Sequence, residues 1–161
     1  IKIAEHIKLI KVETAEEMFN ATQQNLPTDV AIFAAAVSDF KVKKKQKKKI
    51  PKQENMVIDL EKNIDILNYV SNHNSKRPKL VIGFAAETHN LEKNAINKLQ
   101  NKNCDWIIAN DISKKEGGFD SELNEVIIYY KNINYQKEKL SLKKKSEISE
   151  EIVDRIVSHI N

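Results

Sequence analysis

Three apolar stretches of the chain are each followed by polar residues of the kinds that bind or activate ligands. Asp39 comes shortly after the first stretch, Glu87 closes the second, and Asn110-Asp111 follows the third. A carboxylate in such a place can bind a ligand or a metal ion, or it can cap the segment that follows. For Asp39 and for Asn110-Asp111, spacing alone leaves both interpretations open.

The second of these stretches, Gly83–Glu87, has a composition that suits a ligand. Its small residues let a ligand approach the backbone, and Phe84 offers an aromatic face to a base or ring. The alternative interpretation is simple packing within a strand. Phe84 is therefore one candidate for a binding residue.

Two lysines of a helical pattern add cations to this set. In that pattern Leu91, Ala95 and Leu99 form the stripe that faces a sheet, and Lys98 and Lys102, one turn apart, flank the stripe. Long lysine side chains extend their ammonium groups past apolar surface. We therefore expect both ammonium groups to be able to reach the edge of the sheet.

A second group of cations is the lysine-rich stretch Lys41–Lys52, which contains eight lysines. So charged a segment is typical of a mobile surface loop, and a solvated loop without a role is one interpretation. Its position after the carboxyl end of a strand raises an alternative. In that interpretation it is a lid whose lysines compensate the charge of phosphates.

The elements that position these residues alternate between strands and helices. Thr14-Ala15-Glu16-Glu17 fits a capping box, and the helix that it begins ends at Asn25-Leu26-Pro27. Continuous apolar runs predict strands buried on both faces, with a fourth run as an edge strand. The result is an α/β, doubly wound, mainly parallel sheet with helices on both faces, whose ligands bind beyond the carboxyl ends of the strands. The predicted strands are Val30–Val37, Leu80–Ala86, Asp105–Ala109 and Glu125–Tyr130, and the later helices are about Asp65–Asn72, Asn90–Lys102 and Glu147–His159.

The composition describes a single domain. The chain has 161 residues, of which 40% are hydrophobic and 31% charged, enough for an ordinary core. Because no apolar run approaches the length of a membrane span and the first residues lack the form of a secretory signal, we expect a cytoplasmic protein that does not enter a membrane. The lone Cys104 lies beside an apolar run, so we expect it to pack as a small hydrophobe.

The charge and the glycine content restrict the kinds of ligand. The net charge is +4, and Arg77 and Arg155 are the only arginines. Specific nucleic-acid recognition depends on arginine and on stacking aromatics, in which this chain is poor. The chain has three glycines, so a glycine-rich phosphate loop is excluded. Any nucleotide must therefore be held by other groups.

Five segments in a particular order identify a family. They are Ala34–Phe40 (AAAVSDF), Lys49–Lys52 (KIPK), Lys62–Ile66 (KNIDI), Gly83–Thr88 (GFAAET) and Asn110–Ile112 (NDI). Each segment alone is weak, but together they extend over nearly the whole chain. In this order they resemble phosphopantothenoylcysteine synthetase, which in many bacteria is the carboxyl-terminal half of a bifunctional protein that also contains a flavin decarboxylase.

The resemblance implies a Rossmann-like domain that forms a homodimer and joins 4'-phosphopantothenate to L-cysteine. The bacterial type uses CTP, with Mg²⁺ as the expected companion of the triphosphate. The substrate carboxylate attacks the α-phosphate to give an acyl-cytidylate, and the cysteine amine then displaces CMP. FMN is expected only if a decarboxylase domain precedes this one in the gene.

The resemblance also assigns roles to residues. Lys49 is implied as the catalytic lysine of the lid, at the phosphates, and Phe84 as a residue near the base. Lys98 and Lys102 are implied to reach toward the triphosphate. The full set of implied nucleotide-binding residues is Phe33, Ala34, Ala35, Asp39, Lys49, Lys62, Asn63, Ile64, Asp65, Phe84, Lys98 and Lys102.

The chain departs from the family pattern at two positions and at its beginning. Pro51 replaces the third residue of the usual Lys-Ile-Lys-Lys, and Ile64 replaces the proline of Asn-Pro-Asp. The family also opens with a strand, a turn and an Asn-Arg-Ser-Ser-Gly segment that supplies a catalytic asparagine. Since Ile1 follows all of that, we expect residues 1–161 to be a ligase domain that is incomplete at its amino terminus and poorly active alone.

Two other functions remain open. One is a non-catalytic member of the same family that acts as a regulatory or scaffold subunit. The other is a basic domain that binds nucleic acid without sequence specificity through Lys41–Lys52.

Overall fold

The chain folds into two units, which are described separately below. The structure is a computed structural model that describes residues 6–44, 48–51, 55–113, 121–131 and 133–161. The smaller unit comprises residues 1–25 and 36–66, and the larger one comprises residues 26–35 and 67–161.

The larger unit is built on a five-stranded sheet with the order β1-β4-β5-β6-β7. The strands β1, β4 and β5 are parallel to one another, whereas β6 is antiparallel to β5 and β7 is antiparallel to β6. The predicted Rossmann-like α/β fold is confirmed. The strands are β1 (Val30–Phe33), β4 (Leu80–Glu87), β5 (Trp106–Asp111), β6 (Leu123–Tyr130) and β7 (Lys137–Lys144).

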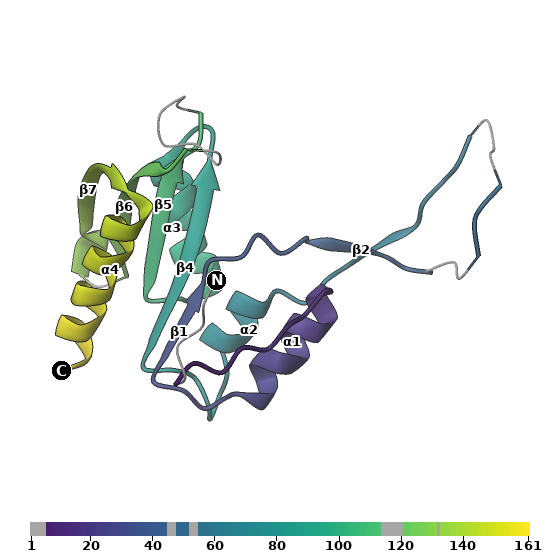
Figure 1. Ribbon diagram of the computed structural model, residues 1–161, viewed down its shortest axis with the longest axis horizontal. Coiled ribbons are helices and arrows are strands. Elements are labelled where there is room, and N and C mark those ends of the chain that lie inside the picture. Colours follow the sequence, from purple (N-terminus) through teal and green to yellow (C-terminus); the bar gives the residue numbers. More distant parts are fainter. Residues whose placement is uncertain (1–5, 45–47, 52–54, 114–120, 132) are drawn as a thin grey trace. The chain divides into compact units, whose positions relative to one another are not determined.

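One face of this sheet packs against the helix α4 (Lys145–Ile160), which Figure 1 shows in yellow beside β6 and β7. Its first turn is fixed by Glu147, whose carboxylate accepts a hydrogen bond from the backbone nitrogen of Lys144 at 3.0 Å. Apolar side chains at every fourth position of α4 then meet alternate residues of the strands. The buried cluster on this face consists of Leu80, Ile82, Trp106, Ile108, Val126, Ile128, Leu140, Ile148, Ile152 and Ile156.

The other face is covered by α2 (Ile66–Ser71) and α3 (Leu91–Lys102). In α3, Ala95 and Leu99 are buried. The close approach depends on Gly83 in the middle of β4, because a Cβ there would lie 2.7 Å from a methyl carbon of Leu67 and 2.9 Å from one of Ile107. The sheet is therefore covered by helices on both faces, as the sequence predicts.

Two strand predictions need correction. The first strand ends at Phe33 rather than Val37, and it is an edge of the described sheet rather than a strand buried on both faces, with Ile32 49% exposed. The run Glu125–Tyr130 is not an edge strand, because β7 pairs with its other side. The sequence analysis did not predict β7.

The smaller unit contains the helix α1 (Ala15–Gln24) and a hairpin of two short strands. The predicted capping box is present, since the Thr14 side chain accepts a hydrogen bond from the Glu17 nitrogen at 3.1 Å, and the Glu17 carboxylate accepts one from the Thr14 nitrogen at 3.1 Å. The strands β2 (Phe40–Val42) and β3 (Leu60–Lys62) pair antiparallel.

The hairpin shows that the predicted lysine-rich loop begins later than Lys41. Lys41 and Val42 do not belong to an irregular loop, because they form backbone pairs with Glu61 and Leu60. The lysine-rich stretch is thus partly strand. Of the remainder, residues 45–47 and Lys52 lie outside the described residues.

Candidate functional site

Glu87, the last residue of β4, belongs to a polar group at the carboxyl edge of the parallel strands. Its Oε2 atom accepts a hydrogen bond from the Asn94 side-chain amide at 2.8 Å, and its Oε1 atom is 3.4 Å from the ammonium nitrogen of Lys98. The Glu87 side chain is only 16% exposed. A carboxylate with so little contact with water needs such partners, because an unpaired charge is costly to bury.

This arrangement follows from the positions of the residues along their elements. Alternation along β4 places Glu87 on the face of the sheet that α3 covers, together with Gly83. Asn94 and Lys98 are four residues apart on α3, so they present their side chains on one flank of the helix. The expectation that Lys98 reaches the edge of the sheet is met in the structure. Sequence reasoning missed Asn94, although its spacing from Lys98 was available.

Asp111 is the backbone partner of Glu87 on the neighbouring strand. Its Oδ1 atom accepts hydrogen bonds from the Ser113 nitrogen at 3.0 Å and from the Ser113 hydroxyl at 2.6 Å. These contacts match the capping interpretation for this carboxylate.

Lys102 is placed differently from Lys98. It is the last residue of α3, its side chain is half-buried, and its backbone carbonyl accepts a hydrogen bond from the Asn72 side chain at 3.4 Å. That carbonyl lies at the end of α3 that leads into β5, whereas the Lys98 ammonium lies at the end where β4 stops. The two lysines share a flank of the helix but sit at different heights along it.

The candidate residues of β1 and β4 also lie on more than one side of the sheet. Phe84 is half-buried and packs against the cluster beneath α4, on the face opposite Glu87. Phe33 pairs with Gly83, and Ala34 and Ala35 follow it as exposed residues beyond the end of β1. Of the predicted residues in the larger unit, Lys98 forms an ion pair with Glu87.

In the smaller unit, the base of the hairpin brings together the segments that contain Asp39 and Lys62. The Asn63 nitrogen donates to the Asp39 carbonyl at 2.8 Å, and its side-chain amide donates to the Ser38 carbonyl at 2.8 Å. Lys62 pairs with Phe40 through the backbone. The remaining candidates of this unit are Ile64 and Lys49, which are exposed, and Asp65, which is half-buried.

Elsewhere in the larger unit, burial raises the pKa of several side chains. Cys104 is buried, as expected from its apolar neighbours, and burial raises the pKa of its thiol to about 11. Burial and a hydrogen bond to Glu138 raise the pKa of Tyr130 to about 12. Within the described residues, no group of three or more His, Cys, Asp or Glu side chains is arranged to hold a metal ion.

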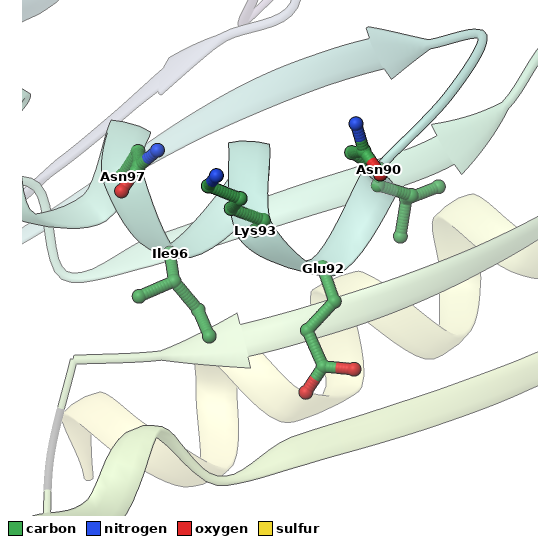
Figure 2. Close-up of a pocket in the computed structure, with 6 residues that line it drawn as sticks. Asn90, Glu92, Lys93, Ile96 and Asn97 are labelled. Atoms are coloured by element: carbon green, nitrogen blue, oxygen red, sulfur yellow. The ribbon is translucent and has the colours of Figure 1, made fainter.

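Two surface hollows lie apart from the Glu87 group. One, of about 580 Å³, lies over the first turns of α3, where Figure 2 shows Lys93 and Glu92 on different sides of the helix. The other, of about 480 Å³, lies where β5 begins and β6 ends, and it contains Trp106 and Tyr130 in an edge-to-face contact. None of the predicted site residues lines either hollow.

A Rossmann-like sheet with a lysine and carboxylates at the carboxyl ends of its parallel strands defines a class of ligand-binding α/β domains. Comparison with known families specifies the class further. Residues 1–160 match the family described as "DNA/pantothenate metabolism flavoprotein C-terminal domain". The chain belongs to this family.

Individual relatives agree with this membership. The chain is 36% identical over 156 residues to the "Coenzyme A biosynthesis bifunctional protein CoaBC" of Haemophilus influenzae, covering 94% of this chain and 37% of that protein. It is 34% identical over 160 residues to a "Cysteine/Cysteine sulfinic acid decarboxylase" of an unknown prokaryotic organism, covering 98% of this chain and 44% of that protein. The chain thus spans less than half the length of these curated relatives.

A solved structure shows the same fold. The crystal structure of the C-terminal domain of Coenzyme A biosynthesis bifunctional protein CoaBC superposes with a TM-score of 0.72 at 34% identity, covering 97% of this chain and 67% of that one. Separately, none of the helices in the described ranges is long and apolar enough to cross a membrane.

Proposed function

We propose that the chain is the ligase domain of a coenzyme A biosynthesis enzyme, which joins 4'-phosphopantothenate to L-cysteine at the expense of CTP. Family membership and the name of the Haemophilus influenzae relative support the pathway. One structural observation carries the nucleotide part of the proposal. Lys98 is held by Glu87 at the carboxyl edge of parallel strands, the place where such folds bind phosphorylated ligands.

The proposed reaction has two steps. A carboxylate is a poor acyl donor, so a carboxylate oxygen of phosphopantothenate first attacks the α-phosphorus of CTP, and the bond to the β-phosphate oxygen breaks to release pyrophosphate. The cysteine amine then attacks the acyl carbon, loses a proton to solvent, and expels CMP. Both steps develop negative charge on phosphate oxygens, which nearby cations stabilise.

The cations proposed for this purpose are lysines. We assign Lys98 and Lys102 of α3 to the triphosphate, and Lys49 of the hairpin to the phosphates as the catalytic lysine. Asp39 and the Lys62–Asp65 segment are assigned to the nucleoside, together with Phe33, Ala34, Ala35 and Phe84. Mg²⁺ would be carried mainly by the triphosphate oxygens, since the described residues offer no acidic cluster of their own.

Calorimetric titration with CTP and Mg²⁺ tests the proposal. We expect the folded chain to bind CTP, and Lys98→Gln to weaken the binding by about tenfold through loss of one charge-assisted contact. Lys93→Gln is the matched control, because Lys93 is an exposed lysine of the same helix. A folded sample that binds no CTP, or equal losses in both variants, would contradict the nucleotide assignment. Titration with ATP measures the base preference.

Product formation tests the second part of the proposal. The family resemblance places a catalytic asparagine in a segment that would precede position 1. We therefore expect residues 1–161 alone to form little phosphopantothenoylcysteine, and a longer protein that includes such a segment to form it at enzymatic rates. Rapid product formation by residues 1–161 would contradict this expectation.

We also propose that the active form is a homodimer in which the hairpin is covered by a second copy. The strands β2 and β3 form a two-stranded ribbon, which is marginal on its own, and its apolar side chains are exposed. Phe40 is 49%, Val42 41% and Leu60 57% exposed. Sedimentation analysis is expected to give a dimer that Leu60→Asp dissociates. A monomeric wild type would overturn this proposal.

One candidate role competes with the ligase. The changes at Pro51 and Ile64 favour a non-catalytic family member, and the relative named as a cysteine decarboxylase shows that the domain also occurs in a protein named for another activity. Binding of CTP without any carboxylate-dependent release of pyrophosphate, even in the longer protein, would favour this candidate. FMN would be bound by a fused decarboxylase domain rather than by residues 1–161.

A further inference from the structure

Glu87 forms an ion pair with Lys98, one of the two lysines of α3 that are assigned to the triphosphate. Its side chain is 16% exposed, whereas that of Lys98 is 39% exposed, so the carboxylate is the more enclosed partner of the pair. We propose that Glu87 is a positioning residue, which fixes the Lys98 ammonium at the end of β4 before the nucleotide arrives. The inference rests on the proposed binding of a nucleoside triphosphate by Lys98.

The carboxylate is itself fixed by a second contact. The Asn94 side-chain amide donates to Glu87 Oε2 at 2.8 Å and also to the His89 carbonyl at 3.1 Å. Asn94 therefore ties the carboxylate to the turn between β4 and α3. With one oxygen held in this way, the other is directed at the Lys98 ammonium, 3.4 Å away.

The benefit of this arrangement is a smaller entropic cost of binding. A lysine side chain has many rotamers, and ordering it at the moment of binding costs free energy. A lysine that is already held by Glu87 and half-covered by the protein loses less freedom when a phosphate arrives. The ion pair also offsets the cost of placing the lysine near the apolar sheet.

The direction in which Glu87→Gln changes the affinity for CTP separates positioning from simple electrostatics. Glu87 brings a negative charge close to a site for a triphosphate, so Coulomb's law alone predicts that Glu87→Gln tightens CTP binding. Loss of positioning predicts the opposite, and we expect Glu87→Gln to weaken CTP binding by about tenfold. In a Lys98→Gln background the same change should have no further effect, because the two residues act through one contact.

Two other variants make the test specific. Asn94→Ala keeps both charges and removes the amide that holds the carboxylate, so we expect a smaller loss of affinity in the same direction. Glu92→Gln is the matched control. It removes one negative charge from α3, but Glu92 is an exposed side chain (Figure 2) that pairs with Lys137 at 2.8 Å. Its affinity for CTP should change less than twofold. Thermal unfolding checks that each variant folds. If Glu87→Gln does not fold, the affinity of Asn94→Ala for CTP decides whether the carboxylate positions Lys98.

A measurement without nucleotide keeps this inference separate from the proposed function. NMR relaxation of the Lys98 ammonium nitrogen should show a lower order parameter in Glu87→Gln than in the wild type. If the wild type binds no CTP, the proposed function fails and the relaxation data alone decide whether Glu87 orders Lys98. If the wild type binds CTP and Glu87→Gln binds it equally or more tightly, the positioning role is overturned and the proposed function stands.

Discussion

The five-stranded sheet and the lysine-rich hairpin are stabilised by different means. In the sheet, β4 and β5 bury almost every apolar side chain between helices, and Ile82 and Ile108 are 0% exposed. In the hairpin, β2 and β3 pair only with each other and leave Val42 and Leu60 exposed. The sheet thus carries its own core, whereas the structure of the hairpin depends on whatever covers it. The following predictions test this difference, beginning with the largest effect.

The strongest test truncates one apolar residue in each region. Ile108→Ala in β5 should lower the free energy of unfolding by about 3–4 kcal/mol, because it removes a fully buried side chain and leaves a cavity. Leu60→Ala in β3 should cost the isolated chain less than about 0.5 kcal/mol, since the side chain is already 57% exposed. Urea denaturation measures both, at a protein concentration low enough for the chain to be monomeric. Equal losses would show that the hairpin has a core of its own.

A second test compares an ion pair from each region. Arg77 donates to Asp105 at 2.9 and 3.0 Å and to the carbonyls of Ser71 and Asn103, which ties together the beginnings of β4 and β5. We expect Arg77→Met to cost about 2–3 kcal/mol, because Asp105 and the carbonyls lose their partner.

The hairpin supplies the matched control. Lys41 lies 3.5 Å from Glu61 across β2 and β3, with both side chains more exposed than those of the Arg77–Asp105 pair. Lys41→Met should therefore change the free energy of unfolding by less than about 0.5 kcal/mol. Urea denaturation of the two variants decides, and a loss at Lys41 as large as that at Arg77 would contradict the contrast between the regions.

A third test uses alkaline pH and acts on the sheet alone. Burial and the hydrogen bond to Glu138 raise the pKa of Tyr130 to about 12 from an ordinary value of about 10. The raised pKa means that this stabilisation is fully present below about pH 10 and is lost as the pH rises through about 12, by about 2 kcal/mol. Unfolding measured across this window should show the loss, and Tyr130→Phe should reduce it. An identical pH dependence in the variant would refute the assignment to Tyr130.

The same two regions show what the sequence predicts and what it does not. Glu87 and Lys98 were placed at the edge of the sheet from strand ends and helical periodicity, because both signals are local. β7 was missed because Lys137–Lys144 contains only Leu140 and Leu142 as apolar residues, and its strand structure comes from pairing with β6. The early end of β1 at Phe33 was missed because the apolar run continues while the pairing with β4 stops.

The smallest expected effect concerns the hairpin and appears only with a ligand. Lys48 and Lys49 are adjacent and both exposed, and the resemblance assigns the phosphates to Lys49. Lys49→Gln should leave the unfolding free energy unchanged and weaken CTP binding by about fivefold, which corresponds to about 1 kcal/mol. Lys48→Gln, with the same change of charge, should alter the affinity less than twofold.

The comparison of these two variants shows how the lysine-rich stretch acts on phosphates. A loss confined to Lys49 would mean that the backbone of the hairpin directs one ammonium group at the phosphates, with Pro51 restricting the chain next to it. Equal losses, both abolished by moderate salt, would mean that the lysines act as a diffuse field. A diffuse field attracts any polyanion, so duplex DNA would then compete with CTP, and the assignment of Lys49 as the catalytic lysine would be wrong.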